Sequence, residues 1–465
     1  MEPRTLKFVA QATEGELLRG SPEVIVSRVC TDSRLLGAGD LFVAVAGDRF
    51  DGHAFVAEAL RKGAAAAMVN RAKMPVGSKS SALIGVEDTR KALAALAVRY
   101  RRDFHCPFIA IGGSNGKTTT KELVASVLRE RLKVLSSEAS FNNALGVPLT
   151  LLNLRATHQL AVLEVGTNHP GELAPLVAMI QPLYGVLTNI GREHLEFFGD
   201  MDGVAQEEGW LAELLPADGA LFVDGDGPDM RKAVARTRAN VVQVGFEPTN
   251  DWRVREVTPG DGGVTFQVEA PDREFGGEYE VRMVGRHQVR NALLAIAIGR
   301  AFGLSRSEIK AGLLRCVPPR MRMQLWKING LHVLDDTYNA NADSMRAALQ
   351  ALLDFPCQGR RVAVLGDMAE LGRHSSAAHA EVGRFAAELG VGQLFAVGSM
   401  APVMGQAARE AGLTTVREFS AVEAATEALQ EFVKAGDVVL LKASRSSRLE
   451  RISESLRARA GDRSG

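Results

Sequence analysis

The sequence predicts an α/β protein with three domains, in which the central domain has a mostly parallel sheet with helices on both faces. Three observations support this fold class. The chain has 465 residues and is 46% hydrophobic, which exceeds what a single core usually supports. Short apolar runs alternate with helical patterns along the sequence. Linkers that end at Pro107 and at the paired prolines of LLRCVPPR predict domains at residues 1–103, 104–320 and 321–465.

Composition limits the kinds of partner and the compartment. Lys+Arg and Asp+Glu both number 55, so no net field attracts nucleic acid or an acidic membrane, and we expect partners to be recognised in local pockets. No apolar run reaches the roughly 18 residues that a membrane-spanning helix needs, and the charged N-terminal stretch is unlike a secretory signal. The 4 cysteines lack CxxC or Cys/His spacing, which argues against disulfides and structural zinc. We predict a cytoplasmic protein without membrane insertion.

The first domain has polar residues after two of its strand-like runs. Ser33 and Arg34 follow VIVSRVCTD, and Gly52 and His53 lie in a turn after LFVAVAG. Because ligands bind at strand ends in such sheets, the two turns form a candidate binding site. A solvated turn explains any one of these residues equally well.

The segment IAIGGSNGKTTTKEL, residues 109–123, joins an apolar strand to a helical pattern through a glycine turn. Glycines let backbone N–H groups approach phosphate oxygens, and the N-terminal end of the following helix favours an anion. Lys117 would reach the outer phosphates, and Thr118 would offer its hydroxyl to a phosphate-bound Mg²⁺. This shortened GxxGKT loop predicts a nucleoside triphosphate site on a P-loop-type sheet. The alternative is a glycine-rich turn that contains a lysine by chance.

Further polar residues follow two later strands of the central domain. Glu164 ends the run LAVL, Asn168 and His169 come just beyond it, and His194 follows LTNIG. Magnesium that bridges phosphates prefers hard oxygen ligands, which Thr118 and Glu164 would supply. A histidine is a softer ligand, so His194 is expected to hold a metal or position the substrate, or else to be structural.

The third domain repeats the alternation of strand, polar loop and helix, which predicts a second doubly wound, Rossmann-like sheet. Asp335 and Asp336 end its first strand, where a carboxylate accepts hydrogen bonds from a ribose. The domain has no GxGxxG, so the sequence does not indicate a dinucleotide site.

Taken together, these motifs resemble those of the Mur ligases, ATP-dependent enzymes that build the peptide of bacterial cell-wall precursors. The resemblance covers nearly the whole chain: TDSR and GDLFVAVAGDRFDGHAF in the first domain, GSNGKTTTKE, LEVGTNHPGE and TNIGREHLEFFG in the second, and DDTYNANADSM, LGDMAELG and LKASRS in the third. YNAN followed by SM, with LGDMAELG, is most like the family member that joins D-alanyl-D-alanine to a UDP-N-acetylmuramoyl-tripeptide.

The resemblance implies a role for each domain. The first would hold the UDP-sugar, the central domain would bind ATP and Mg²⁺, and the third would close over nucleotide and dipeptide. The partners would be the UDP-N-acetylmuramoyl-tripeptide and D-alanyl-D-alanine, and we expect a monomer. The implied ATP contacts are Gly113, Ser114, Asn115, Gly116, Lys117, Thr118, Thr119, Asn291, Arg322 and Asp336. The implied substrate contacts are Ser33, Arg34, Gly52, His53, Asn143, Asn168, His169, Tyr338, Asn339 and Asn341. The implied metal ligands are Thr118, Glu164 and His194.

The chain departs from the family pattern at a position expected to matter for catalysis. Mur ligases usually carry a carbamylated lysine in a segment that corresponds to VAQEEGWLAEL, where this chain has Glu208. Our hypothesis is that Glu208 supplies the negative charge of the carbamate and helps to hold magnesium. Two smaller departures are Ser140 in place of an asparagine and Ala342 in place of a proline, which would loosen its loop.

The implied chemistry is amide formation through an acyl phosphate, with Lys117, Glu164, His194 and Glu208 as the catalytic set. This chemistry needs positioning and charge neutralisation more than a protein nucleophile. Rival functions are another Mur-type ligase, a folylpolyglutamate-type ligase, a non-catalytic binder of a UDP-muramoyl-peptide, and an ATPase motor. The first-domain turns argue against folate, and YNAN argues against a diamino acid as the amine.

Overall fold

The computed structural model describes residues 1–47, 50–73 and 82–461, so Asp48 and Arg49 of the GDRFDGHAF motif lie outside the described residues. The chain divides into two compact units. The first comprises Met1–Ala110, Leu132–Thr167 and Glu172–Tyr184; the second comprises Ile111–Arg131, Asn168–Gly171 and Gly185–Gly465. Among the described helices, none combines the length and apolar character that a membrane crossing requires.

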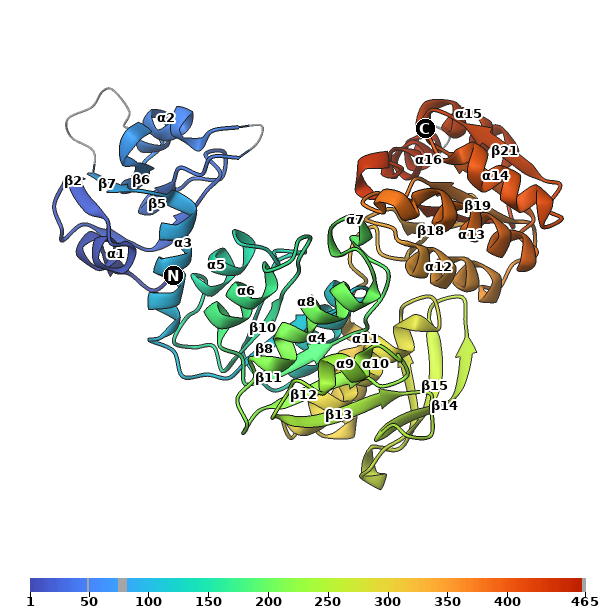
Figure 1. Cartoon of the computed structure of the whole chain (residues 1–465), viewed down its shortest axis with the longest axis horizontal. Coiled ribbons are helices and arrows are strands. Elements are labelled where there is room, and N and C mark those ends of the chain that lie inside the picture. The colour runs from blue at the N-terminus through green and yellow to red at the C-terminus, as the bar shows by residue number, and fades with distance from the viewer. Residues whose placement is uncertain (48–49, 74–81, 462–465) are drawn as a thin grey trace. The chain divides into compact units, whose positions relative to one another are not determined.

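The N-terminal part of the first unit is built on a five-stranded sheet of order β2-β7-β6-β5-β4, which is parallel except for β2 (Figure 1). Its strands are β2 (Glu16–Arg19), β4 (Arg28–Cys30), β5 (Asp40–Val43), β6 (Ala66–Asn70) and β7 (Ala82–Val86), and a short antiparallel pair joins β1 (Arg4–Thr5) to β3 (Ile25–Val26). Its helices are α1 (Leu6–Thr13), α2 (Val56–Arg61) and α3 (Thr89–Arg101). This arrangement is the small α/β domain that the sequence predicts.

The central sheet has nine strands in the order β16-β15-β14-β13-β12-β11-β8-β10-β9, and the boundary between the two units falls within β8 (Phe108–Gly112). All five residues of β8 are buried, as expected for an interior strand covered on both faces. The other strands are β9 (Val134–Ser136), β10 (Leu160–Glu164), β11 (Tyr184–Leu187), β12 (Ala220–Asp224), β13 (Asn240–Gly245), β14 (Trp252–Pro259), β15 (Val264–Glu269) and β16 (Gly277–Val281). The last two pairings, β14 with β15 and β15 with β16, are antiparallel.

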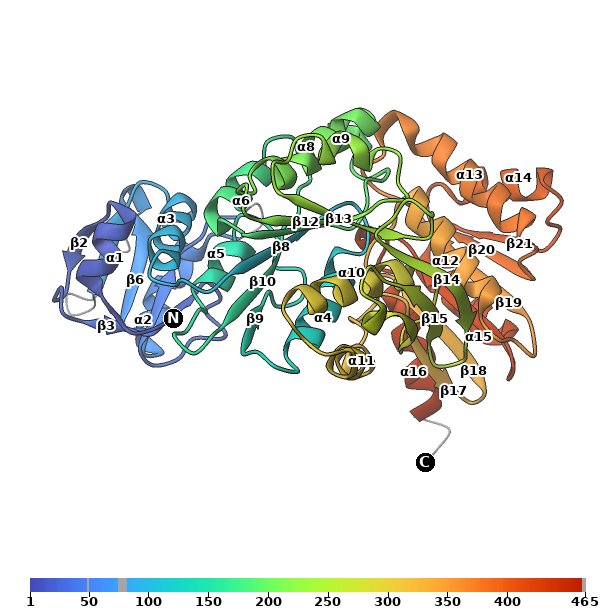
Figure 2. The same ribbon diagram turned by 90° about the horizontal axis from the view of Figure 1, so that it is seen from below.

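Helices follow the strands of this region as the sequence rhythm predicts. In the second unit, α4 (Lys117–Leu128) packs against α10 (His287–Ala301) and α11 (Arg306–Arg315), which Figure 2 shows close together. A capping box between Ser305 and Glu308 begins α11. The remaining helices are α5 (Gly146–Leu151) and α6 (Leu173–Ile180) in the first unit, and α7 (Leu195–Phe198), α8 (Met201–Glu213) and α9 (Met230–Val234) in the second.

The C-terminal part of the second unit has a six-stranded sheet of order β17-β18-β22-β19-β20-β21, parallel except for β17. Its strands are β17 (Gln324–Ile328), β18 (Leu331–Asp336), β19 (Arg361–Gly366), β20 (Gln393–Val397), β21 (Val416–Phe419) and β22 (Val438–Lys442). Its helices are α12 (Ala342–Asp354), α13 (Ser375–Glu388), α14 (Ala401–Glu410), α15 (Val422–Phe432) and α16 (Glu450–Gly461).

Alternate residues of these strands enter two separate hydrophobic cores. Leu440 packs with α12, α13 and α14 on one face, whereas Leu441 packs with α15 and α16 on the other. Figure 1 shows the two helical layers on either side of the sheet. The predicted fold class, α/β with helices on both faces of mostly parallel sheets, is therefore confirmed. The domain boundaries at 103 and 320 stay predictions.

Candidate active site

The glycine turn after β8 adopts a backbone that excludes side chains. Gly113 and Gly116 have φ angles of 106° and 85°, in the region that favours glycine. A Cβ on Gly113 would lie 2.5 Å from Thr188 Oγ1, and one on Gly116 would lie 2.7 Å from Asn291 Oδ1. The turn runs directly into α4, whose N-cap residue Gly116 provides no side-chain cap. The first N–H groups of a 12-residue helix are thus presented without a capping side chain, as an anion site requires.

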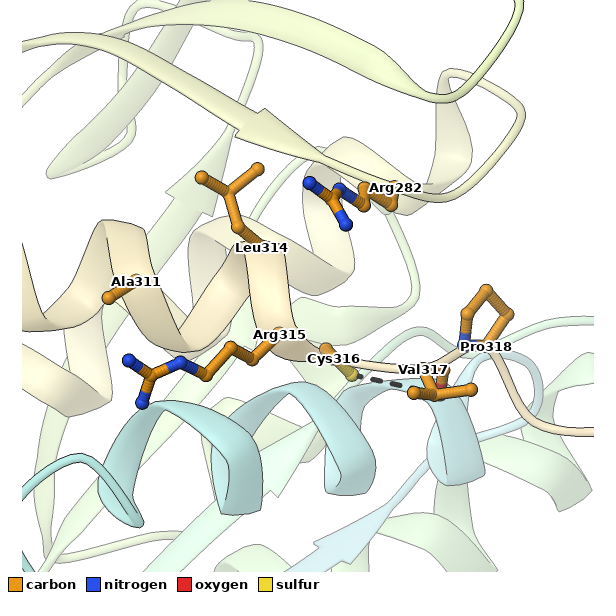
Figure 3. Close-up of a pocket in the computed structure, with 7 residues that line it drawn as sticks. All are labelled: Arg282, Ala311, Leu314, Arg315, Cys316, Val317 and Pro318. Carbon is orange, nitrogen blue, oxygen red and sulfur yellow. Dashed lines mark hydrogen bonds between the residues drawn. The ribbon is translucent and has the colours of Figure 1, made fainter.

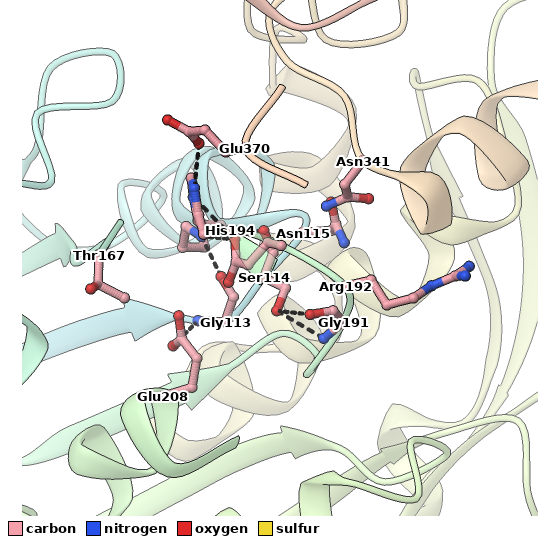
Figure 4. A network of polar contacts seen from close by, with 12 residues as sticks. Gly113, Ser114, Asn115, Thr167, Gly191, Arg192, His194, Glu208, Asn341 and Glu370 are labelled. Atoms are coloured by element: carbon pink, nitrogen blue, oxygen red, sulfur yellow. Dashed lines mark hydrogen bonds and ion pairs between the residues drawn. The ribbon is translucent and has the colours of Figure 1, made fainter. Parts of the chain in front are cut away.

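The loop after β11 braces this turn (Figure 4). The backbone N–H of Ser114 donates to Asn189 O at 2.9 Å, and that of Asn115 donates to Asn189 Oδ1 at 3.0 Å. In return, Asn189 Nδ2 donates to Asn115 O at 2.7 Å, and Gly191 N donates to Ser114 Oγ at 2.8 Å. These reciprocal bonds hold the turn in one shape before any ligand arrives.

Lys117, the first residue of α4, folds back over the turn. Its ammonium donates to Gly113 O and, at 3.2 Å, to Ser114 O, and it lies 3.4 Å from Glu193 Oε2. The charge is therefore placed above the uncapped helix end, where Lys117 is predicted to meet the outer phosphates. Thr119, on the same first turn of α4, is buried.

Buried oxygens gather around this lysine. Glu208 lies on α8 and is 1% exposed; its Oε2 accepts a hydrogen bond from Gly113 N at 2.6 Å. Burial raises the pKa of Glu208 to about 8, although the charge of Lys117 opposes this shift. In the described part of the chain, Thr118 Oγ1, Glu193 Oε1 and Glu208 Oε1 are buried and have no hydrogen-bond partner. Such oxygens are costly to bury and suit a hard cation such as Mg²⁺.

His194, which follows β11, connects the central part of the second unit with its C-terminal part through Glu370. It is the N-cap residue of α7, with a left-handed φ of 48°. Its Nδ1 lies 2.5 Å from Glu370 Oε2 (Figure 4), and its Nε2 lies 3.9 Å from Glu193 Oε2. The hydrogen bond with His194 lowers the pKa of Glu370. Both ring nitrogens thus face carboxylates, and the one that Nε2 faces, Glu193, also lies beside Lys117.

Other predicted nucleotide contacts form two groups in the second unit. Asn291, on α10, accepts from Thr120 Oγ1 at 3.2 Å and borders Gly116. Asp336 ends β18 and accepts from the buried Lys442 Nζ at 2.6 Å. The same ammonium donates to Asn339 O at 3.0 Å, and the Arg322 guanidinium lies 4.0 Å from the centre of the Tyr338 ring.

Asn341 connects the third predicted domain to the glycine turn after β8. Its Nδ2 donates to Asn115 Oδ1 at 2.9 Å, and its side chain also caps α12 through a capping box with Ser344. Ala342 is the first, buried residue of that helix, so α12 begins in regular geometry without a proline. His169 packs on Phe197 with ring centroids 4.2 Å apart, and Asn168 is exposed.

Two predicted residues of the central domain, Glu164 and Asn143, lie in the first unit. Glu164 ends β10 and is 1% exposed; its Oε1 accepts from Asn142 Nδ2 at 2.8 Å, while its buried Oε2 has no partner among the described residues. Asn143 Oδ1 accepts from the N–H groups of Leu145 and Gly146 at the start of α5. The metal-binding role of Glu164 stays a prediction, and the side chain of Asn143 has a structural role at the start of α5.

The two turns near the N-terminus also have internal contacts. The exposed Arg34 pairs with Asp32 at 2.6 Å, and Ser33 O accepts from Lys62 Nζ at 2.9 Å. The His53 ring contacts Asp51 Oδ1 at 2.6 Å and accepts from Asn70 N at 2.9 Å, so both nitrogens brace the turn. Gly52 lies too close to Val45 to carry a Cβ. For His53, these contacts favour the structural explanation.

Sequence reasoning missed Glu193, Arg192 and Glu370. The first two lie beside His194, after the same strand, and this proximity was the only signal for them. Arg192 forms ion pairs of 2.6 Å with Asp343 and with Glu381. Glu370 belongs to LGDMAELG, a motif that indicates the family but assigns no role to this residue.

A separate cavity of about 430 Å³ lies near the end of α11 and contains none of the predicted residues (Figure 3). Burial raises the pKa of its one thiol, Cys316, to about 12, so this cysteine is not a ready nucleophile. Across residues 1–47, 50–73 and 82–461, no cluster of three or more histidine, cysteine or acidic side chains has the arrangement of a metal site. A metal held mainly by phosphate oxygens and water does not need such a cluster.

The residues that line the cavity near the end of α11 are Arg282, Ala311, Leu314, Arg315, Cys316, Val317 and Pro318.

Comparison with known families gives three matches in chain order. Residues 25–101 match the Mur ligase family catalytic domain, residues 111–299 match the Mur ligase middle domain, and residues 321–445 match the Mur ligase glutamate ligase domain. The glycine turn at residues 113–116, Glu193, His194 and Glu208 all lie within the middle-domain match, and Glu370 lies within the third.

Individual relatives match over nearly the full length. The UDP-N-acetylmuramoyl-tripeptide–D-alanyl-D-alanine ligase of Bacillus subtilis is 33% identical over 459 residues, which cover 98% of this chain and 99% of the relative. A crystal structure of MurF from Acinetobacter baumannii has a TM-score of 0.88 at 33% identity, covering 98% of this chain and 99% of that one. The MurF ligase of Thermotoga maritima, solved in complex with ADP, has a TM-score of 0.80 at 30% identity and covers 94% and 99%. Because both sequence and fold agree from end to end, this chain belongs to the Mur ligase family.

Proposed function

We propose that this chain is an ATP-dependent carboxylate–amine ligase that adds D-alanyl-D-alanine to a UDP-N-acetylmuramoyl-tripeptide in peptidoglycan precursor synthesis. The observation that carries the chemistry is the uncapped N-terminal end of α4 with the Lys117 ammonium above it. The choice of substrates is supported by full-length relatives that carry this activity in their names. The monomeric state and cytoplasmic location stay predictions.

The reaction proceeds in two balanced steps. A carboxylate oxygen of the tripeptide attacks the γ-phosphorus of ATP, the bond to ADP breaks, and an acyl phosphate forms. The amine nitrogen of D-alanyl-D-alanine then adds to the acyl carbon, loses a proton and expels inorganic phosphate. Lys117 and the N–H groups of residues 114–119 would stabilise charge on the transferred phosphoryl group.

Magnesium fits the residues around this loop. The buried, unpartnered oxygens of Thr118, Glu193 and Glu208, within the described residues, suit a hard cation, and His194 Nε2 faces the same group. When bound, Mg²⁺ would neutralise phosphate charge during transfer. Glu193 thus joins Thr118 and His194 as a proposed ligand, and Glu164 stays a predicted one.

The remaining predicted contacts have separate proposed roles. Asn291 would lie beside the nucleotide, since it borders Gly116, and the Asp336–Lys442 pair with Arg322 and Tyr338 would receive nucleotide and dipeptide. We propose residues 1–103 as the UDP-sugar domain, in which Ser33 and Arg34 are the candidate contacts and His53 has a structural part.

A phosphate-release assay tests this function. We expect release only when ATP, a UDP-N-acetylmuramoyl-tripeptide and D-alanyl-D-alanine are all present, together with a product whose mass equals that of the two joined substrates less water. Tripeptides with different third residues, single amino acids and a folate–glutamate pair would complete the panel. Release that needs no amine would indicate an ATPase, and binding of the UDP-peptide without release would indicate a binder.

A further inference from the structure

Glu370 is held in an unusual position between two parts of the second unit. It lies between β19 and the turn Gly372–His374, and its φ of 58° is left-handed although it is not a glycine. Its carboxylate contacts His194, and its backbone oxygen accepts from Glu196 N at 3.1 Å. One residue of the C-terminal part thus binds His194, at the end of the loop after β11, through its side chain and the first turn of α7 through its backbone.

The contact determines how His194 presents its ring. A carboxylate at 2.5 Å from Nδ1 favours the proton on that nitrogen, which leaves the lone pair of a neutral imidazole on Nε2. Nε2 points toward Glu193, whose carboxylate also lies 3.4 Å from Lys117 Nζ. The basic nitrogen of His194, Nε2, therefore faces the carboxylate of Glu193, which lies beside Lys117.

Neighbouring contacts also hold the C-terminal part of the second unit against the loop after β11 and the glycine turn after β8. Arg192 lies between Asp343 and Glu381, with ion pairs of 2.6 Å to each, and Asn341 binds Asn115. Glu370 differs from these residues because its partner is a predicted metal ligand (Figure 4). Glu381 has no contact with His194 in the described structure and serves as a matched control. It is also an acidic residue of the C-terminal part that pairs with the loop after β11, through Arg192.

We propose that Glu370 is a positioning residue that orients His194 Nε2 toward the metal ion bound with the nucleotide. Docking of the C-terminal part of the second unit onto the loop after β11 then completes the metal site. This inference rests on the proposed ATP–Mg²⁺ function of the loop. A side chain that orients a metal-binding histidine typically contributes 10- to 100-fold in metal affinity.

The test compares Glu370→Ala, Glu370→Gln, Glu370→Asp and Glu381→Gln in the full chain. Binding of Mn²⁺·ADP, followed by electron paramagnetic resonance, should weaken by roughly 10- to 100-fold in Glu370→Ala and less in Glu370→Asp. Binding of ADP without metal should stay unchanged in all four. NMR of ¹⁵N-labelled histidine should show His194 protonated on Nδ1 in the wild type and a mixture of tautomers in Glu370→Ala, with Glu381→Gln like the wild type.

Two outcomes would overturn the proposal. Equal weakening of Mn²⁺·ADP binding in Glu370→Ala and Glu381→Gln would show that the contact only docks the domain. Unchanged tautomer and unchanged metal binding in folded Glu370→Gln and Glu370→Ala would show that Glu370 does not orient His194. Because neither readout needs peptide joining, a wild-type chain that binds Mn²⁺·ADP but makes no product would refute the proposed function without refuting this inference.

Discussion

Lys117→Ala is expected to reduce kcat/KM for ADP formation by on the order of 10³-fold, the loss seen when one strong donor to a developing charge is removed. The ammonium lies above the uncapped start of α4 and contacts loop carbonyls, so no neighbouring cation is positioned by the same turn to replace it. The measurement is steady-state ADP release with all three substrates. Lys117→Arg should rescue activity only partly, because a planar guanidinium does not fit the place of a compact ammonium.

Lys327→Ala is the matched control, since Lys327 is an exposed lysine on β17. It should turn over like the wild type. Circular dichroism would confirm that Lys117→Ala is folded. Near-normal ADP release from a folded Lys117→Ala protein would remove Lys117 from the proposed mechanism.

The second large effect is expected at Glu208. Glutamine keeps an oxygen that accepts the hydrogen bond from Gly113 N but cannot carry a negative charge. If the carboxylate stands in for the carbamate, Glu208→Gln should raise the Mg²⁺ concentration needed for half-maximal activity by roughly 10- to 100-fold and lower turnover. Titration of activity with Mg²⁺ measures this. Glu213→Gln, on the same helix and paired with Arg236 at the surface, should leave both quantities unchanged.

Stability against pH, measured without Mg²⁺, reports the protonation of Glu208 in the metal-free chain, where burial keeps the carboxyl mostly neutral below pH 8. The proposed role therefore requires that binding of Mg²⁺ displace this proton. The pKa of Glu208 is raised to about 8 in the folded chain from an ordinary value of 4.5, because burial disfavours the charged form. The folded state therefore holds this proton more tightly than the unfolded state, and the stabilisation present below pH 4.5 is lost as pH rises toward 8. In Glu208→Gln, the free energy of unfolding should fall less steeply than in the wild type as pH rises from 4.5 toward 8. Identical pH profiles would show that the pKa of Glu208 is not raised, and an unchanged Mg²⁺ requirement would contradict the hypothesis that Glu208 helps to hold magnesium.

Local patterns predicted the backbone of the glycine turn at residues 113–116 well, because turn geometry is set by consecutive residues, whereas its phosphate-binding role stays a prediction. Glycines at 113 and 116 both have the backbone angles and close contacts that only glycine tolerates. The acidic surroundings of Lys117 were harder to predict. Glu193 is the acidic residue of TNIGREH, but only the structure shows that its carboxylate lies 3.4 Å from Lys117 Nζ.

Long-range contacts explain what sequence reasoning could not supply. Glu370 and His194 are 176 positions apart, and no periodicity relates them. Conversely, His53 looked like a ligand because it follows a strand, yet Asp51 and Asn70 engage both of its nitrogens. A strand end indicates where ligands bind, but the contacts of each side chain decide whether that side chain serves the ligand or the turn.

The central claim is that the phosphate loop makes a carboxylate reactive by phosphorylating it. The test uses a UDP-N-acetylmuramoyl-tripeptide in which both oxygens of the reacting carboxylate are ¹⁸O. It is incubated with ATP, D-alanyl-D-alanine and the purified chain, and the released phosphate is analysed by mass spectrometry. An acyl phosphate requires that each phosphate released during ligation contain one ¹⁸O atom. Phosphate that is released without the label while the amide forms would contradict the account.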